Sequence, residues 1–270
     1  MSSTPDLNRI KAFTKAAWMA GDYAKFANYW EPGALEILAG WAIPSGCRML
    51  DVACGAGQIS LPAARAGARV TGIDIATNLV EKARASAASE KLSVQFDEGD
   101  MEELPYPSSS FDVVVSMLGV MWAVRPERVA AELVRVCRSG GRIILVNWTP
   151  SGPMGQVIEG ARSGRPQTTP SPTLWGQEEV VRERLKDGIA DLHFARGIYP
   201  SVRYPFGPQE VAKIFLRDNG PARIMFDSVP PEQQPAVLKG LEQLFANHNR
   251  ATDGTVRLDC EYLETTAMRA

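Results

Sequence analysis

The residues best suited to chemistry lie in one glycine-rich stretch, residues 50–58, with the sequence LDVACGAGQ. The stretch follows an apolar strand and opens a helix. Gly55 and Gly57 let the backbone turn sharply and approach a ligand without a Cβ clash. In doubly wound α/β folds such a turn lies at the carboxyl end of the sheet, where ligands bind. The G-x-G loop alone is a weak signal, because dinucleotide-binding folds share it.

Asp51, close before the glycines, favours one kind of ligand. A carboxylate at the end of the strand would repel a pyrophosphate, but it suits a ligand that carries an ammonium group and a sulfonium. Position 60 is Ser, where the dinucleotide pattern has Gly or Ala, which is a slight difference because Ser is also small. The loop therefore favours an adenosyl sulfonium over a dinucleotide.

Further candidate residues follow the next two strands. Asp74 ends the second predicted strand, 17 residues after Gly57, where it can accept both ribose hydroxyls, as it would in a NAD site. Ile75 is an apolar neighbour for the adenine. After the third strand, Asp100 can accept the adenine amino group while the Met101 backbone N–H faces a ring nitrogen. Loops that leave consecutive parallel strands meet at one sheet edge, so they can surround one ligand.

Alternating strands and helices are expected to position these loops. The predicted strands are 47–52, 68–73, 92–96, 111–117 and 142–148, and the predicted helices between them are 58–66, 77–90 (with Thr77 as N-cap) and 126–138. This alternation indicates a parallel sheet covered on both faces. One more strand within 189–204 and a last strand that closes the sheet edge complete the fold. The predicted fold class is α/β, with a doubly wound, mostly parallel seven-stranded sheet and a helical cap.

We expect one structural domain with three parts. Residues 1–45 form N-terminal cap helices, residues 46–150 form the ligand-binding core, and residues 151–270 form the remainder of the sheet with inserted lid helices.

Residues 47–148 resemble a class I S-adenosylmethionine-dependent methyltransferase of the "type 11" group, which includes ubiquinone and menaquinone biosynthesis methyltransferases. The matching pieces are LDVACGAG, VTGIDIA, EGDMEELPYPSSSFDVV and ELVRVCRSGGRIILVNW. The segment LPYPSSSFD, residues 104–112, is quite specific to this group. Ala53 stands where the family usually has Gly. The resemblance implies S-adenosylmethionine as cofactor and S-adenosylhomocysteine as product.

Carried over by position, the resemblance also implies cofactor-binding residues. They are Asp51, Ala53, Gly55 and Gly57 around the methionine part, Asp74 and Ile75 at the ribose and adenine, Asp100 and Met101 at the adenine edge, Ser116, Met117 and Leu118 beside the sulfonium, and Asn78 as a weaker candidate. Alternatives remain open for three of them. Asp74 can cap a helix, Asp100 can solvate a loop, and Ser116 can be a buried strand hydroxyl.

Methyl transfer from a sulfonium requires little of the protein beyond alignment and exclusion of water. A fixed catalytic residue is therefore not required, and the catalytic residue is left unassigned. His248, at the end of a predicted helix, is a candidate base if the lid folds over the site, or else a cation at a helix terminus. His193 lies in a predicted strand and is expected to be structural. The sequence after the fourth strand is SMLGVMW, which differs from the motifs of nucleic-acid amino and cytosine-5 methylation.

Aromatic residues outside the core are the candidates for an acceptor pocket. They are Tyr23, Tyr29, Trp30, Trp122 and Trp148, with Trp175 beside the same loop region. Their number suggests an apolar or aromatic acceptor, although each one alone is as well explained by core or lid packing.

The composition of the chain argues against several classes of binding partner. The chain has 270 residues, of which 45% are hydrophobic, and a net charge of −2, whereas a nucleic-acid binder needs a basic face. The cysteines form no C-x-x-C pair, so no metal site is expected. The N-terminus shows no apolar signal region and no apolar run approaches the roughly 20 residues of a membrane helix, so we expect a cytoplasmic protein without a membrane partner. Its oligomeric state is left open between monomer and homodimer.

Three functions compete. The leading one is methyl transfer from S-adenosylmethionine to a small, apolar or aromatic molecule at oxygen, nitrogen or carbon. The alternatives are a NAD-dependent oxidoreductase, and a protein of the same fold that binds the cofactor but performs another reaction, such as a cyclisation.

Overall fold

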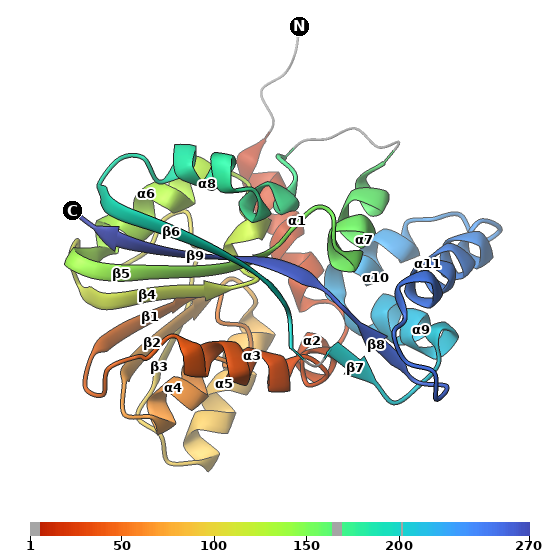
Figure 1. Ribbon diagram of the computed structural model, residues 1–270, viewed down its shortest axis with the longest axis horizontal. Coiled ribbons are helices and arrows are strands. Elements are labelled where there is room, and N and C mark those ends of the chain that lie inside the picture. Colours follow the sequence, from red (N-terminus) through yellow and green to blue (C-terminus); the bar gives the residue numbers. More distant parts are fainter. Residues whose placement is uncertain (1–5, 164–168, 201) are drawn as a thin grey trace, which may run out of the picture.

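A seven-stranded sheet forms the centre of the computed structural model, which describes residues 6–163, 169–200 and 202–270 (Figure 1). The strand order is β3-β2-β1-β4-β5-β9-β6. These strands are β1 (Arg48–Val52), β2 (Arg69–Asp74), β3 (Gln95–Glu98), β4 (Phe111–Met117), β5 (Cys137–Trp148), β6 (Ile189–Ile198) and β9 (Glu261–Arg269). Only β9 runs antiparallel to its neighbours within the sheet.

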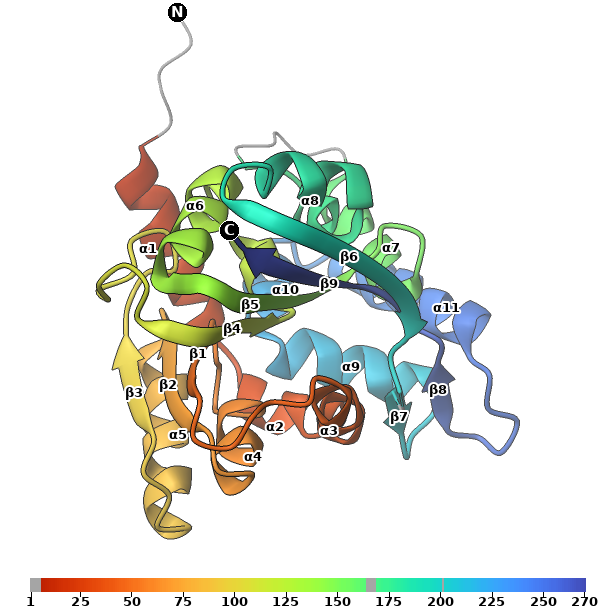
Figure 2. The ribbon, with the colours of Figure 1, turned by 60° about the vertical axis from the view of Figure 1, so that its left-hand side comes forward.

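Helices cover both faces of the sheet (Figure 2). One face carries α3 (Glu31–Gly40), α4 (Ser60–Arg65) and α5 (Thr77–Ser89), and the other carries α6 (Pro126–Val136) and α8 (Glu178–Arg184). The central strands are consequently apolar along their length, since residues 113–115 and 143–146 are all buried. The doubly wound class expected from the sequence is confirmed.

The remaining elements gather beside the carboxyl ends of the parallel strands (Figure 1). They are α1 (Leu7–Met19), α2 (Tyr23–Ala27), α7 (Pro153–Arg162), α9 (Pro208–Asp218), α10 (Gly220–Asp227), α11 (Gln234–His248), the 3-10 helices η1 (Val120–Trp122) and η2 (Pro172–Gly176), and a small sheet of β7 (Val202–Tyr204) and β8 (Val256–Leu258). Asp6 and Asp22 cap α1 and α2 by accepting backbone N–H groups of the first helical turns.

Two local expectations for the α5–β3 region were wrong. The third strand begins at Gln95 rather than at residue 92, because Leu92 still belongs to the helix end, where its N–H donates to the Ala87 carbonyl. Thr77 is the first residue of α5 rather than its N-cap. The cap position is Ala76, whose N–H donates to the Asp74 carboxylate at 2.8 Å.

The C-terminal part differs from expectation in three ways. The last strand, β9, lies between β5 and β6, so β6 forms the sheet edge. Residues 189–204 hold two strands, because the chain leaves the large sheet after Ile198 and β7 pairs with β8. Helix α10 was not foreseen from Gly220-Pro221, which here starts a helix capped by the Asn219 side chain. His193, which was expected to be structural, is exposed on the edge strand β6, where its Nε2 lies 2.8 Å from Asp191 Oδ2, so it has no part in the core.

Helix α6 fixes the LPYPSSSFD segment. The Arg135 guanidinium donates to the carbonyls of Tyr106 (2.7 Å) and Leu104 (2.9 Å), and it pairs with Glu132 at 2.7 Å. The buried Glu132 carboxylate also accepts the Leu104 N–H at 2.8 Å, and the Arg135 contact holds the pKa of Glu132 below its usual range. The segment between β3 and β4 is therefore tied to α6 through both its donors and its acceptors.

Replacing Arg135 by Met tests this anchor. The variant loses two hydrogen bonds to carbonyls and leaves the buried Glu132 without its closest cation, so we expect the free energy of unfolding to fall by about 2–3 kcal/mol. Arg138→Met is the matched control, because Arg138 pairs with Asp112 near the surface and its loss is expected to be below about 1 kcal/mol. Urea denaturation measures both, and equal losses would contradict the anchor.

Candidate functional site

The glycine-rich loop joins β1 to α4 with an unusual backbone. Ala53, Gly55 and Gly57 have φ angles of 57°, 56° and 91°, which is the left-handed region. Glycine adopts this region freely, whereas Ala53 is strained there by about 1–2 kcal/mol. Gly57 has little room for a side chain, because a Cβ there would lie 3.1 Å from Leu61, so this glycine is required by the turn itself. Ala53, which stands where the family usually has Gly, thus adopts the left-handed backbone of the loop at an energetic cost.

Asp51 lies at the end of β1 beneath this loop. Its carboxylate is buried and accepts a hydrogen bond from Ser60 Oγ at 2.6 Å. Burial raises the pKa of Asp51 to about 7, with the nearby Asp74 adding to the effect against the Ser60 bond. At neutral pH the group is therefore poised between its neutral and charged forms, and a cation placed beside it would favour the charged one.

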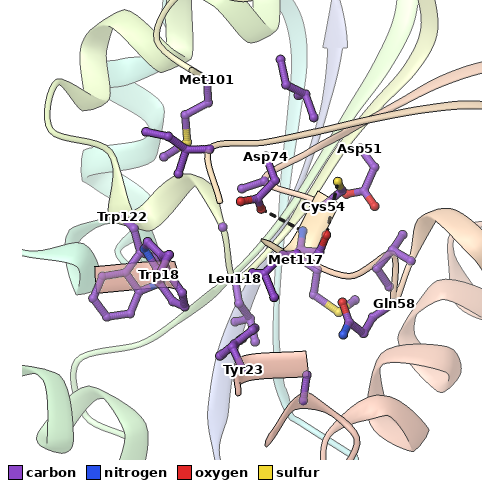
Figure 3. Close-up of a pocket in the computed structure, with 18 of the residues that line it drawn as sticks. Trp18, Tyr23, Asp51, Cys54, Gln58, Asp74, Met101, Met117, Leu118 and Trp122 are labelled. Atoms are coloured by element: carbon purple, nitrogen blue, oxygen red, sulfur yellow. Dashed lines mark hydrogen bonds between the residues drawn. The ribbon is translucent and has the colours of Figure 1, made fainter. Parts of the chain in front are cut away.

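Asp74, at the end of β2, is held by two backbone donors. Its Oδ2 accepts the Gly55 N–H at 2.8 Å (Figure 3). Its Oδ1 accepts the Ala76 N–H, also at 2.8 Å. The carboxylate thus links the glycine-rich loop to the start of α5. It also lines a cavity, so capping and ligand contact are compatible roles for the same group.

The loop after β3 is tied to α1. One carboxylate oxygen of Asp100 accepts the Glu102 N–H at 2.8 Å and the other pairs with Lys11, which also pairs with Glu102 at 2.8 Å. Lys15 pairs with Glu98 in the same way. Helix α1 therefore lies against this edge of the site.

Aromatic side chains from three elements close the opposite side. The Trp18 ring meets Tyr23 edge-on at 5.1 Å between ring centroids and Trp122 at 5.3 Å. Figure 3 shows this tryptophan pair on a different side of the pocket from the carboxylates of Asp51 and Asp74. Leu118, after β4, has a φ of 60°, a strained value for a branched side chain.

These loops surround a first cavity of about 120 Å³. Of the residues expected from the sequence, those that line it are Tyr23, Trp30, Asp51, Ala53, Gly55, Asp74, Ile75, Asp100, Met101, Met117, Leu118 and Trp122. The loops that follow β1, β2, β3 and β4 thus meet at one place, as the sequence indicates.

A second cavity of about 280 Å³ adjoins the first. The two share lining residues, namely Thr14, Trp18, Tyr23, Trp30, Leu118, Trp122, Ala123 and Val124. Beyond them the second cavity is bounded by Trp148 and by apolar side chains of α7, α9 and α10, such as Ile158, Phe215 and Met225.

Several expected residues line neither cavity. Ser116 is fully buried, donates to the Val52 carbonyl at 2.7 Å and accepts the Val120 N–H, so it fastens β4 to β1 and η1. Gly57 faces Leu61. Asn78 points to α1, where its amide donates to the Met19 carbonyl at 3.3 Å. Tyr29 packs on Tyr204 at 5.0 Å between ring centroids.

His248 also lies away from both cavities. It ends α11, partly exposed, with its Nε2 3.0 Å from Gln156 Oε1 on α7. The lid does not bring this imidazole to the site, so the geometry gives no support to a role as base. Trp175 is buried beneath Arg184, 4.7 Å from the guanidinium carbon to the ring centroid, and is core packing.

Several residues that line the first cavity were not predicted from the sequence. Lys11, Thr14 and Trp18 come from α1, Glu31 comes from α3, and Gln58 follows Gly57 of the glycine-rich loop. The helical spacing of 11, 14 and 18 signals a shared face, but nothing in the sequence shows that this face turns toward the carboxyl ends of the strands.

Comparison with known proteins agrees with this geometry. The family model of the methyltransferase domain matches residues 50–145. A protein of uncharacterized function from Mycobacterium tuberculosis is 38% identical over 216 residues, which cover 78% of this chain and 78% of the relative. The chain therefore belongs to the class I S-adenosylmethionine-dependent methyltransferases, and S-adenosylmethionine is its cofactor.

Two further similarities are to proteins whose names state an activity. Phosphoethanolamine N-methyltransferase 2 of Haemonchus contortus, solved with S-adenosylhomocysteine, superposes with a TM-score of 0.59 at 18% identity, covering 89% of this chain and 52% of that one. An S-adenosyl-L-methionine-dependent Diels-Alderase of Talaromyces variabilis is 40% identical over 116 residues, 41% of this chain and 40% of the relative.

Metal clusters and membrane-spanning helices are both absent from the described residues. Within residues 6–163, 169–200 and 202–270, no group of three or more His, Cys, Asp or Glu side chains is arranged to hold a metal ion. Among the same residues, every helix is too short or too polar to cross a bilayer.

We expect Asp51 to make cofactor binding sensitive to pH. We expect the cofactor ammonium to lie beside this carboxylate and to bind its ionised form, whose share grows as the pH rises through about 7. The affinity for S-adenosylhomocysteine should therefore rise about tenfold from pH 6 to pH 8. Calorimetric titration at both values measures this, with Asp51→Asn expected to give a flat profile. An unchanged wild-type affinity would contradict the assignment.

Proposed function

We propose that this chain transfers the methyl group of S-adenosylmethionine to a small, apolar or aromatic molecule held in the second cavity. One observation carries the proposal. The cavity formed by the loops after β1, β2, β3 and β4 adjoins a larger apolar cavity, and the two share Leu118, Trp122 and Tyr23 as walls. A methyl donor in the first cavity and an acceptor in the second would thus face each other across these side chains.

The cofactor is expected to lie along the sheet edge. Asp51, Ala53 and Gly55 would flank the methionine part, Asp74 and Ile75 the ribose and adenine, Asp100 and Met101 the adenine edge, and Met117 and Leu118 the sulfonium. Support comes from the two backbone N–H bonds of Asp74, which hold its carboxylate in one orientation. The remaining lone pairs of such a carboxylate are suited to two adjacent hydroxyl donors.

The acceptor site is expected to come from the cap. In this proposal residues 1–45 and the inserted helices of 151–270 form a cover over the core of 46–150, because the second cavity draws its walls from α1, α7, α9 and α10 as well as from η1. Its many apolar side chains favour an apolar or aromatic body. With the acceptor bound, these apolar walls would also limit the access of water to the sulfonium.

Alignment is the main contribution of the protein to this reaction. The sulfonium supplies a good leaving group, so the displacement needs the nucleophile, the methyl carbon and the sulfur in line. Tyr23 and Trp122 project from different elements and bound both cavities, so they are placed to restrict the approach of the acceptor.

Titration with S-adenosylhomocysteine tests the cofactor part of the proposal. We expect micromolar binding that falls about 100-fold in Asp74→Ala, because two charge-assisted hydrogen bonds to the ribose are lost. Asp74→Asn separates loss of charge from collapse of the loop, and a thermal unfolding scan checks that each variant folds. Asp191→Ala, at an exposed aspartate of β6, is the control and should bind like the wild type. Preference for NADH, or full affinity in Asp74→Ala, would refute the proposed site.

A second candidate is a reaction without methyl transfer. The relative whose name is an S-adenosyl-L-methionine-dependent Diels-Alderase shares 40% identity over 116 residues, and a cavity lined by apolar side chains suits a cyclisation as well. Mass spectrometry distinguishes the two. Methylation adds a methyl group to the acceptor and yields S-adenosylhomocysteine, whereas cyclisation leaves both masses unchanged.

A further inference from the structure

Aromatic rings form the wall that the two cavities share. Among the described lining residues, Trp18, Tyr23, Trp30 and Trp122 are the aromatic ones that border both cavities. The ring plane of Trp18 stands at 87° to that of Tyr23 and at 76° to that of Trp122. Rings at right angles form adjoining walls rather than a flat stack, and the negative faces of such rings attract a cation. This shared aromatic wall is therefore suited to a positive charge.

The lining of the first cavity carries an excess of negative charge. Its described residues include one cation, Lys11, which pairs with two of the acidic side chains. The acidic residues of this lining are Glu31, Asp51, Asp74, Asp100 and Glu102. Their field reaches the shared aromatic wall, because burial and then the charge of Asp74 raise the pKa of Tyr23 to about 12. An anion beside this wall would be repelled, whereas a cation would be attracted.

The second cavity has no group that would take a proton. Its described lining contains no Asp, Glu, His, Cys or Lys side chain. Thr14 donates its hydroxyl to the Ile10 carbonyl at 3.1 Å, and the raised pKa of Tyr23 keeps this phenol protonated at neutral pH. Arg162, the cation of the lining, donates to the Thr169 carbonyl at 2.7 Å and borders the second cavity alone. An acceptor that must lose a proton to this lining would find no base.

We propose, on the basis of the methyl transfer proposed above, that the acceptor is an apolar molecule with a weakly basic nitrogen that carries no hydrogen, such as the ring nitrogen of a heteroaromatic compound, and that the shared aromatic wall holds its cationic product. The nitrogen lone pair forms the bond to the methyl carbon, and the carbon–sulfur bond breaks with its electron pair going to sulfur. The positive charge thereby passes from sulfur to nitrogen, and no proton is released. The products are an N-methylated cation and S-adenosylhomocysteine, whose sulfur is neutral.

The path of the charge explains why the site favours this class of acceptor. Formation of a cation in an apolar cavity is costly unless nearby groups stabilise it. Here the rings border both cavities, so the charge stays beside them as it moves from sulfur to nitrogen, and the carboxylates of the first cavity attract it throughout. An oxyanion would have to bind close to those carboxylates, and an acceptor with an N–H group would leave a proton to be removed.

Binding of the product cation tests the shared aromatic wall without turnover. With S-adenosylhomocysteine bound to the full chain at neutral pH, calorimetry should show 1-methylquinolinium binding about tenfold more tightly than 4-methylquinoline. The second probe has the same two rings and one methyl group but is uncharged. Equal affinities, or tighter binding of the uncharged probe, would overturn the proposal.

Variants of the wall show whether its rings cause this preference. Trp122→Leu and Trp18→Leu should each lower the preference to about threefold or less, whereas Trp122→Phe keeps a ring and should retain most of it. Phe206→Leu is the matched control, because Phe206 is a partly exposed aromatic residue outside both linings, and it should keep the full preference. A thermal unfolding scan checks that each variant folds. A preference that survives in both leucine variants would refute the role of the wall.

Turnover tests the class of acceptor directly. Quinoline, isoquinoline and acridine are incubated with the full chain and S-adenosylmethionine, with 1-naphthol and 1-naphthylamine as comparators of similar size. We expect mass spectrometry to show N-methylated cations from the ring nitrogens and no methylation of the comparators. Methylation of 1-naphthol or 1-naphthylamine at a higher rate than every ring nitrogen would overturn the proposal.

The same experiments separate this inference from the proposed function. If S-adenosylhomocysteine fails to bind, the cofactor site itself is misassigned. If it binds and 1-naphthol is the compound methylated, the function stands and the nitrogen acceptor is wrong.

Discussion

The site depends on one carboxylate that is shared between two loops. Asp74 accepts the N–H of Gly55 from the loop after β1 and the N–H of Ala76 at the start of α5. Together with the Cys54 N–H, which donates to the Ile73 carbonyl at 3.0 Å, this link fixes the left-handed backbone at Ala53 and Gly55 relative to β2. The strain at Ala53 persists because parallel pairing of β1 with β2, which sets Asp51 opposite Gly72, holds the end of the loop that leaves β1.

A second set of hydrogen bonds, made by side chains that do not line the first cavity, holds these loops in place. Ser116 joins β4 to β1 and to η1, and Glu132 with Arg135 holds the segment between β3 and β4. None of these three side chains lines the first cavity. These hydrogen bonds do not depend on a ligand. They therefore explain how the loops can hold a strained residue such as Leu118 at the cavity.

The sequence predicts the core better than the cap, for physical reasons. Buried parallel strands read as apolar runs, and the residues at their carboxyl ends can be placed at one edge, so Asp51, Asp74 and Met101 were brought together as expected. Ser116 was ambiguous because a strand-end hydroxyl can face a ligand or a neighbouring strand. The contributions of Lys11 and Trp18 depend on how α1 docks, which no local pattern encodes. His248 became a candidate base because of its residue type, whereas its position depends on the packing of α11 on α7.

Helix α1 provides walls to both cavities through Thr14 and Trp18. It is also held to the loop after β3 by the ion pairs of Lys11 and Lys15. A wall that two ligands share cannot adjust to one of them without changing the free energy of binding the other. With the cofactor in the first cavity and the acceptor in the second, as proposed, we expect their binding to be thermodynamically coupled. The coupling is reciprocal, so any change that the acceptor causes in the affinity for the cofactor is matched by the change that the cofactor causes in the affinity for the acceptor.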